Sequence, residues 1–373
     1  MVNYKPLVVG MAWVTALGNS LEGVWNSLLC GETGIKTYSF SFKLKNNLAA
    51  LVPDIPFALD SWARLQKLTL DCIKCAVNDS HIDLKGKKVQ LVVGTSFGAS
   101  LDYSENCQVT LYDWLIDVNK VLGYNTQPVL VSTSCSSGSD AIAMGAELIR
   151  SNSVDICICG GADILTQSKL MAHSELGTMS PTMLKAFDKT HDGTILGEGA
   201  AFIVLVNSQN KHLVKKQYGS IVGSASSNDA SGFTAPDLTG QSVVMAIRRC
   251  LQDAHLDHTQ VEIINAHGSG TVINDTVELK AYNALFQSQK KPIIFATKGN
   301  LGHTLGATGA MEVVALLLAI KMGKVPPVYL LDSPISDYLV PAQKNITKKA
   351  TFQNGLSITL GFGGYNTCIA VQK

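Results

Sequence analysis

The chain contains two stretches in which the same features follow in the same order, and this repetition limits the folds that it can adopt. The first stretch is residues 75–98, CAVNDSHIDLKGKKVQLVVGTSFG, and the second is residues 250–270, CLQDAHLDHTQVEIINAHGSG. Each begins at a predicted helix end and passes through Asp-x-His, an aliphatic residue and Asp. Both then continue into a polar turn, a strand and a Gly-rich loop. The correspondence predicts two halves related by duplication. Further along, residues 155–163 and 200–206 correspond to residues 355–364 and 366–373.

Each half also carries one long helix of small residues, over residues 136–152 and 307–323. These helices hold few charges, and their Ala, Gly and Ser residues let backbones approach closely, so we expect both to be buried. Strands alternate with helices, and most strands are apolar almost throughout, which predicts mostly parallel sheets covered on both faces. We therefore predict an α/β fold of five layers, α/β/α/β/α, with residues 1–206 as one half and residues 207–373 as the other. The polar segment 207–217 is expected to connect them across the surface.

The amino-acid composition is consistent with this layered fold and argues against several functions. The 373 residues are 46% hydrophobic and 16% charged, which is typical of a protein with a large buried core. Thirty basic and 29 acidic residues nearly cancel, so the charge gives no basis for binding nucleic acid or a membrane surface, although a local basic patch could still dock one acidic partner. The N-terminal apolar run is interrupted by Gly, Thr and Asn, which favours a first strand over a signal or anchor and predicts a cytoplasmic protein.

Nine cysteines in a chain without a predicted secretory signal argue against a disulfide framework. We expect most of them to be free and buried. Cys72 and Cys75 are separated by two residues but lie in a predicted amphipathic helix, and no second pair stands at zinc spacing. We therefore interpret them as ordinary core residues and predict no metal site.

Six motifs occur in order along nearly the whole chain, and no single one would identify a family. They are VTALGNSLEGVWNSLLCGETGI, TSCSSGSDAIAMGAELI, FDKTHDGTILGEGAA, INAHGSGTVINDTVELKA, TKGNLGHTLGATGAMEV and GFGGYNT. With them the chain resembles the β-ketoacyl-acyl carrier protein synthases of the thiolase superfamily, in particular the elongating type I/II branch. The resemblance implies a thiolase-like duplicated five-layered fold. It also implies an acyl carrier protein as substrate, which brings its own phosphopantetheine, and no cofactor held by the chain itself.

The resemblance implies that Cys135 holds the acyl group. Acyl transfer between thioesters needs a soft nucleophile, and Cys135 stands where an apolar run gives way to a helical pattern. At a helix N-terminus, the macrodipole and backbone N–H groups are expected to lower the pKa of its thiol. The backbone N–H of Phe362, in the loop GFGGYN, is expected to lie opposite that of Cys135 and to complete an oxyanion hole.

Two histidines, His267 and His303, stand in motifs rich in glycine. They are expected to donate hydrogen bonds to the enolate that forms when a malonyl thioester loses carbon dioxide. A cysteine with two histidines separates this branch from the chain-starting relatives, which pair the cysteine with His and Asn. The resemblance implies that Lys298 and Glu312 form a buried ion pair that orients the histidines, because charges in apolar runs are costly to bury unpaired.

Further residues are expected to bind substrate. By resemblance, the carboxylate of Glu278 lies close to the ion pair. The hydroxyls of Ser269 and Thr271 match groups that bind the phosphopantetheine arm, and Thr234 is a further candidate. Phe97, in GTSFGAS, matches the position that lines the far end of the acyl tunnel. Because an aromatic ring there would fill the channel, we predict a preference for short or flat unsaturated acyl groups.

The chain departs from the family pattern at three motif positions and in one segment. His191 stands where the family usually has Arg, Gly299 where it has Ser, and Tyr365 where it has Thr. Only forty residues separate Thr95 from Cys135, fewer than is typical of the family. This shortening leaves the shape of the acyl pocket and the self-association of the chain open.

Several functions remain open on the sequence. We favour a condensing enzyme that extends an acyl group on Cys135 with malonyl-acyl carrier protein and releases carbon dioxide. The alternatives are a non-elongating acyltransferase and a chain-length-factor-like partner subunit, although such partners generally lack the nucleophile. We expect a homodimer or a heterodimer with a second ketosynthase-like subunit. Primary fatty acid synthesis and specialised polyketide or polyene assembly both fit, and the shortened segment favours the latter.

Overall fold

In the described part of the chain, ten strands form one continuous hydrogen-bonded series with a repeated internal order. The computed structural model describes residues 4–102, 110–209, 214–232, 236–287, 291–337, 341–343, 346–347 and 351–373. The strands in the series are β1 (Pro6–Val14), β4 (Val89–Gly94), β5 (Val129–Val131), β6 (Ile156–Asp163), β7 (Gly199–Asn207), β8 (Gly219–Asn228), β9 (Ile263–Asn265), β10 (Ile293–Phe295), β13 (Asn354–Gly361) and β14 (Tyr365–Gln372). Short strands outside it are β2 (Lys36–Thr37), β3 (Leu48–Ala49), β11 (Lys324–Val325) and β12 (Ile346–Thr347).

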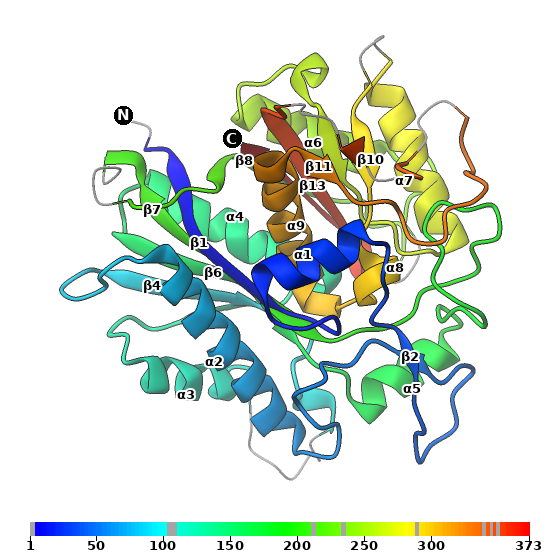
Figure 1. Cartoon of the computed structure of the whole chain (residues 1–373), viewed down its shortest axis with the longest axis horizontal. Coiled ribbons are helices and arrows are strands. Elements are labelled where there is room, and N and C mark those ends of the chain that lie inside the picture. Colours follow the sequence, from blue (N-terminus) through cyan, green and yellow to red (C-terminus); the bar gives the residue numbers. More distant parts are fainter. Residues whose placement is uncertain are drawn as a thin grey trace.

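The helices fall between these strands. They are α1 (Leu21–Leu29), α2 (Ser61–Ser80), α3 (Asp113–Leu122), α4 (Ser137–Arg150), α5 (Gln167–Glu175), α6 (Gln241–Asp253), α7 (Val272–Leu285), α8 (Lys298–Leu301) and α9 (Thr308–Met322). Figure 1 shows α4 and α9 at the centre of the molecule, with α2 and α3 on one outer side and α6 and α7 on the other. The layers α/β/α/β/α follow from this arrangement.

The strand order confirms the duplication. The series runs β10-β9-β13-β14-β8-β1-β7-β6-β4-β5, so the order β5-β4-β6-β7-β1 in the first half is repeated as β10-β9-β13-β14-β8 in the second. Among the described strands, the two sheets join only where β1 meets β8, through the pairs Leu7 with Ser220 and Val8 with Gly219. The predicted correspondence of β4, β6 and β7 with β9, β13 and β14 therefore holds in space.

The expectation of mostly parallel sheets holds for the direction of four of the five strands in each half, but one strand in each half runs the other way. Within each half two strand pairs are parallel and two are antiparallel, because β7 and β14 run against both of their neighbours. The reason is clearest at β13 and β14, where Gly361 pairs with Tyr365 across a turn of three residues. A connection this short can only reverse the chain, since a parallel partner needs a crossover of about a dozen residues or more.

The central helices approach each other through small residues. A Cβ added at Gly138 of α4 would lie 2.9 Å from the backbone oxygen of Gly306 and 3.0 Å from the backbone nitrogen of Ala310. A Cβ added at Gly309 of α9 would lie 1.9 Å from the Oγ of Ser139. Distances this short exclude a larger residue at either glycine, so the small residues set how closely the two halves pack.

Helix α9 is buried on every side from Thr308 to Ile320, and most of its residues are apolar. The window Leu305–Met322 is long and apolar enough to cross a membrane by length and composition, and 89% of it is buried inside the molecule. Strands β6, β7, β9 and β13 pack around it. A helix surrounded in this way has the composition expected of a core helix in a large protein.

The cysteines fit the prediction with one exception. The eight described cysteines are free, and six of them are buried. Cys72 lies in the core against β1 and β7, as predicted. Cys75, one turn further along α2, is exposed, so its interpretation as a core residue was wrong.

Candidate active site

Cys135 lies in a tight turn between β5 and α4. The preceding residue, Ser134, has a left-handed backbone with φ of 54°, and a single 3-10 turn over Ser134–Ser136 leads directly into the helix. The Oγ of Ser137 accepts a hydrogen bond from the Thr133 N–H at 2.9 Å and donates one to the Ser134 carbonyl at 2.6 Å. The turn presents Cys135 at the helix N-terminus with 6% of its surface exposed.

A second turn, between β13 and β14, packs against this one. A Cβ at Gly361 would lie 3.3 Å from the backbone nitrogen of Cys135, and Gly363 and Gly364 have φ of 81° and 77°, which favours glycine at both. The turn brings the Phe362 backbone N–H to the Cys135 sulfur as a hydrogen-bond donor. The two turns thus bring the backbone of Phe362 next to that of Cys135, as an oxyanion hole made of their two N–H groups would require.

The expected low pKa of the Cys135 thiol was wrong. Burial raises its pKa to about 11, although the Phe362 N–H and the Lys298 ammonium act in the opposite direction. The helix N-terminus favours the thiolate, but the loss of water around the sulfur disfavours it more strongly. Cys135 is therefore a thiol at rest.

His303 is held so that one defined ring nitrogen donates. The ring is buried, and its Nδ1 accepts a hydrogen bond from the backbone N–H of Leu305 at 3.1 Å. Burial, the Lys298 ammonium and the neighbouring His173 hold the pKa of His303 well below its usual value, so the ring is neutral. A neutral imidazole whose Nδ1 accepts carries its proton on Nε2.

His267 is held in the same tautomer by a different group. Its Nδ1 lies 3.1 Å from the Nζ of Lys298, and an ammonium can only donate. Burial, Lys298 and His303 hold the pKa of His267 well below its usual value. The two histidine rings lie 5.3 Å apart at an angle of 81°, each with its proton on Nε2. Both Nε2–H groups are therefore available as donors.

Lys298 and Glu312 form the buried ion pair that the resemblance implied. The Nζ of Lys298 donates to the Oε1 of Glu312 and to the His267 backbone oxygen, as well as to the His267 ring. These contacts use all three donors of the ammonium. The Oε2 of Glu312 accepts from the Thr359 hydroxyl at 2.8 Å, and burial raises the pKa of Glu312 to about 7 against the effect of Lys298. The pair thus positions His267.

Glu278 lies behind the His267 loop and not in the wall of the cavity. It is fully buried, and its oxygens accept from the backbone N–H of His267 at 2.6 Å, from that of Gly268 at 2.8 Å and from the Tyr282 hydroxyl at 2.5 Å. Burial raises its pKa to about 7. Since its carboxylate is occupied and does not line the cavity, Glu278 is a positioning residue for the His267 loop and not a substrate ligand.

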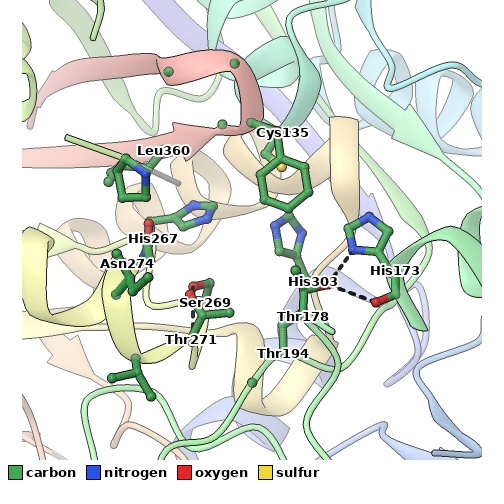
Figure 2. A pocket seen from close by; sticks show the side chains of 18 of the residues that line it. Cys135, His173, Thr178, Thr194, His267, Ser269, Thr271, Asn274, His303 and Leu360 are labelled. Carbon is green, nitrogen blue, oxygen red and sulfur yellow. Dashed lines mark hydrogen bonds between the residues drawn. The ribbon is translucent and has the colours of Figure 1, made fainter. Parts of the chain in front are cut away.

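A cavity of about 340 Å³ brings these residues together. Figure 2 shows Cys135, His267 and His303 around it, with Ser269 and Thr271 further along the wall. The Ser269 and Thr271 oxygens lie 2.9 Å apart, where a polar chain in the cavity can reach them. The lining residues are Cys135, His173, Gly177, Thr178, Asp192, Gly193, Thr194, Pro236, His267, Ser269, Thr271, Val272, Ile273, Asn274, His303, Leu360, Gly361, Phe362, Gly363, Gly364 and Asn366.

Sequence reasoning missed several polar lining residues. His173 and Thr178 lie in segments with no chemical motif of their own, and only the fold brings them to the cavity. The segment between β6 and β7, which contains α5, contributes both, and its unusual length was the one signal that could have drawn attention to them. Asn274 lies within the motif INAHGSGTVINDTVELKA but was not singled out there. Among the described residues, no group of three or more His, Cys, Asp or Glu could hold a metal ion.

The predicted role of Phe97 is not supported. Its ring is 53% exposed, and it does not line the cavity that contains Cys135. Its backbone is left-handed, with φ of 63°, in the turn after β4. In the isolated chain Phe97 is therefore not part of the wall around Cys135. Thr234, the weaker candidate for the phosphopantetheine arm, lies outside the described residues.

Two of the three residues that depart from the family pattern are explained by their contacts in the structure. Gly299 packs against Tyr329, and a Cβ there would lie 2.7 Å from the Cβ of Tyr329, so the site has no room for Ser. His191 is buried, and its Nδ1 lies 3.1 Å from the Oδ2 of Asp275. Tyr365 is exposed at the start of β14 and has no comparable explanation.

Known proteins match the chain over nearly its whole length. Residues 7–211 match the family described as beta-ketoacyl synthase, N-terminal domain, and residues 218–332 match the C-terminal domain of the same enzymes. The 3-oxoacyl-(acyl-carrier-protein) synthase 2 of Synechocystis sp. is 29% identical, over 99% of this chain and 98% of its own. The tetracenomycin polyketide synthase ketoacyl synthase alpha subunit of Streptomyces glaucescens is 27% identical, over 99% of this chain and 97% of its own.

Solved structures give the same fold. The ishigamide ketosynthase/chain length factor superposes with a TM-score of 0.90 at 24% identity, over all of both chains. A type II ketosynthase in complex with its acyl-carrier protein superposes with a TM-score of 0.89 at 23% identity, over 99% of both chains. Since the two matched domains cover more than half of the residues, the chain is a member of the beta-ketoacyl synthase family, the acyltransferases of fatty acid and type II polyketide synthesis.

Proposed function

We propose that the protein condenses an acyl group held on Cys135 with a malonyl group from acyl carrier protein, releasing carbon dioxide. The observation that carries the proposal is the pairing of two donor sets in one cavity. The Cys135 and Phe362 N–H groups serve the acyl thioester, and the Nε2–H groups of His267 and His303 serve a second thioester oxygen.

The first half-reaction is acyl transfer. The Cys135 sulfur attacks the carbonyl carbon of the acyl-carrier thioester, and the oxyanion lies between the Cys135 and Phe362 N–H groups. The carrier C–S bond then breaks, and the proton of the Cys135 thiol passes to the departing phosphopantetheine thiolate. Because the resting cysteine is a thiol with a raised pKa, this proton transfer has to accompany the attack.

The second half-reaction is decarboxylative condensation. The bond between the malonyl carboxylate and its carbon breaks, and the electron pair moves into the thioester carbonyl to give an enolate. The Nε2–H groups of His267 and His303 donate to the enolate oxygen. The enolate carbon attacks the acyl carbon, a C–C bond forms, the C–S bond to Cys135 breaks, and the thiolate takes a proton from water.

The carrier protein is the proposed partner. Relatives are named for acyl carrier protein, and one solved relative is in complex with its own. We place the phosphopantetheine arm along Ser269 and Thr271, whose hydroxyls line the cavity beyond the histidines. The alignment with the Synechocystis relative spans 420 positions against the 373 residues of this chain, so that relative carries segments that are absent here. This supports a different acyl pocket, as the short segment before Cys135 suggests.

Intact-mass measurement tests the first half-reaction. The unmodified protein incubated with an acyl-carrier protein should gain the mass of one acyl group, and Cys135→Ala should gain none. Cys75→Ala, which changes an exposed cysteine on α2, is the control and should load normally. Equal loading of the Cys135→Ala protein would overturn the assignment of the nucleophile.

Release of carbon dioxide tests the second half-reaction and separates condensation from simple acyl transfer. His267→Ala or His303→Ala should slow decarboxylation and condensation by about 100-fold or more, while acyl loading survives better. A Cys135→Gln protein should still decarboxylate malonyl-carrier protein because both histidines remain. An unmodified protein that loads acyl groups but never releases carbon dioxide would identify it as a non-elongating acyltransferase.

A further inference from the structure

A third histidine lies at the cavity and has no role in the reaction described above. His173 stands in the last turn of α5 and lines the same cavity as Cys135 and His303. Its ring stacks on that of Phe362, with centroids 5.6 Å apart and an angle of 19° between the planes. The N–H of Phe362 donates to the Cys135 sulfur, which would hold the acyl group. His173 therefore packs against a residue that lies next to the expected position of the acyl thioester.

The tautomer of His173 is opposite to that of the other two histidines. The Thr178 hydroxyl donates to the backbone oxygen of His173 at 3.2 Å, and the same oxygen atom of Thr178 lies 3.0 Å from Nδ1. Figure 2 shows both contacts as dashed lines. A hydroxyl has one proton; we assign that proton to the backbone oxygen, which leaves the Thr178 oxygen to accept from Nδ1–H. Burial and Lys169 lower the pKa of His173 to about 4, which keeps the ring neutral.

The Nε2 of His173 is therefore a lone-pair acceptor. In the described part of the chain, no hydrogen bond to this nitrogen is found. The cavity thus presents two Nε2–H donors, on His267 and His303, and one Nε2 acceptor. A plain hydrocarbon chain packed against that nitrogen would displace its water without donating a hydrogen bond in its place. A chain that carries a hydrogen-bond donor would replace the lost hydrogen bond.

We infer that His173 is a specificity-determining residue that accepts a hydrogen bond from a hydroxyl, enol or amide N–H close to the thioester of the acyl group. The inference rests on the proposed function, because the acyl group has to reach Cys135. It assigns a substrate class: acyl groups that carry a donor within a few atoms of the thioester, in preference to saturated hydrocarbon acyl groups of the same length.

The test is a competition between two acyl groups that differ by one hydroxyl. Butanoyl and 3-hydroxybutanoyl groups, each on the same carrier protein, are offered together, and the ratio of the two acyl-enzymes on Cys135 is read by intact mass. The unmodified protein should favour the hydroxy group by about tenfold, the scale of one hydrogen bond to an acceptor in the cavity wall. His173→Phe keeps a planar ring against Phe362 but removes the acceptor, and should bring the ratio close to one.

Further variants separate this role from a merely structural one. His173→Asn retains a side-chain acceptor and should keep part of the preference for the hydroxy group. Thr178→Val removes the hydroxyl that fixes the tautomer of His173 and should reduce this preference. Met171→Ala, at an exposed position of the same helix, is the control and should leave the ratio unchanged. Because the readout is a ratio within each protein, a variant with reduced total loading still reports it.

The outcomes are distinct. Equal loading of the two groups by the unmodified protein, or an unchanged preference in His173→Phe, would overturn the inference. A uniform fall in loading of both groups in His173→Phe, with the ratio kept, would assign His173 to the pantetheine arm instead and would also overturn it. Failure of Cys135 to load either group would refute the proposed function itself.

Discussion

At the scale of single residues, burial decides the chemistry of this site more than charge does. The thiol of Cys135 has a raised pKa, and His267 and His303 have lowered ones, because all three side chains have lost most of their water. Each group is therefore neutral at rest. Motifs found in the sequence identified these three residues, but no motif reports how much water the fold removes, so the state of the thiol could not be predicted.

The reactivity of Cys135 toward an alkylating reagent should follow its raised pKa. Iodoacetamide reacts with thiolates, and the thiolate fraction of a group with a pKa of about 11 rises with pH throughout the neutral range. We expect the alkylation rate to increase about tenfold per pH unit between about pH 7 and about pH 9. Peptide mapping separates Cys135 from the exposed Cys30 and Cys75. A rate that is already constant at neutral pH would contradict the raised pKa.

Glu278 should affect both stability and one kinetic step. Glu278→Gln places an amide group against the backbone N–H groups of His267 and Gly268 and loses at least one of these bonds. We expect the free energy of unfolding to fall by about 1–3 kcal/mol, and kcat for decarboxylation to fall while KM for the carrier stays. Tyr282→Phe keeps both backbone bonds and should have the smaller effect. Wild-type values of both quantities in Glu278→Gln would argue against a positioning role.

At the scale of helices and strands, the repeated order of the sequence predicted the architecture, and its details depended on turns. The correspondence of α2 and β4 with α6 and β9 was visible because both stretches keep the same turn residues. Strand direction was not visible, since apolar runs look alike in parallel and antiparallel sheets. His173 was missed for a similar reason: nothing in helix α5 itself marks it, and only the return of β7 brings that helix to the cavity.

The contact between α4 and α9 should be intolerant of one added methyl group. In Gly138→Ala the new Cβ would lie 2.9 Å from the Gly306 oxygen, and both helices would have to shift. We expect a loss of about 1–3 kcal/mol in the free energy of unfolding and a reduced rate of acyl loading, because Cys135 moves with α4. Met144→Ala, at a position of α4 that is 42% exposed, should change stability by less than about 0.5 kcal/mol. The prediction fails if both variants unfold at the same temperature as the unmodified protein.

At the scale of the whole molecule, the sheet has an open end. Strand β5 is the last in the series, and its three residues, Val129, Leu130 and Val131, are only partly buried. Open apolar edges favour pairing with another chain. The edge lies next to the Cys135 turn, so a partner at β5 would stand close to the site.

Light scattering should give the mass of a dimer, either of this chain alone or after a second ketosynthase-like subunit is added. A lysine on an edge strand opposes pairing, so Leu130→Lys should shift the equilibrium toward monomer. Met322→Lys, at an exposed position at the end of α9, is the matched control and should leave the mass unchanged. A stable and fully active monomer would contradict the expectation.

Helix α9 has a consequence for the synthesis of the chain. In a chain that stops before Asn354, the segment Leu305–Met322, which by length and composition suits a lipid bilayer, lacks the strand that covers one side of it, Asn354–Gly361. An apolar helix left uncovered in this way favours contacts with other molecules over its packing against β6, β7 and β9. A transcript that ends before Asn354 would therefore yield a product prone to aggregation or mislocalisation, and the last two strands act as the closing step of biogenesis.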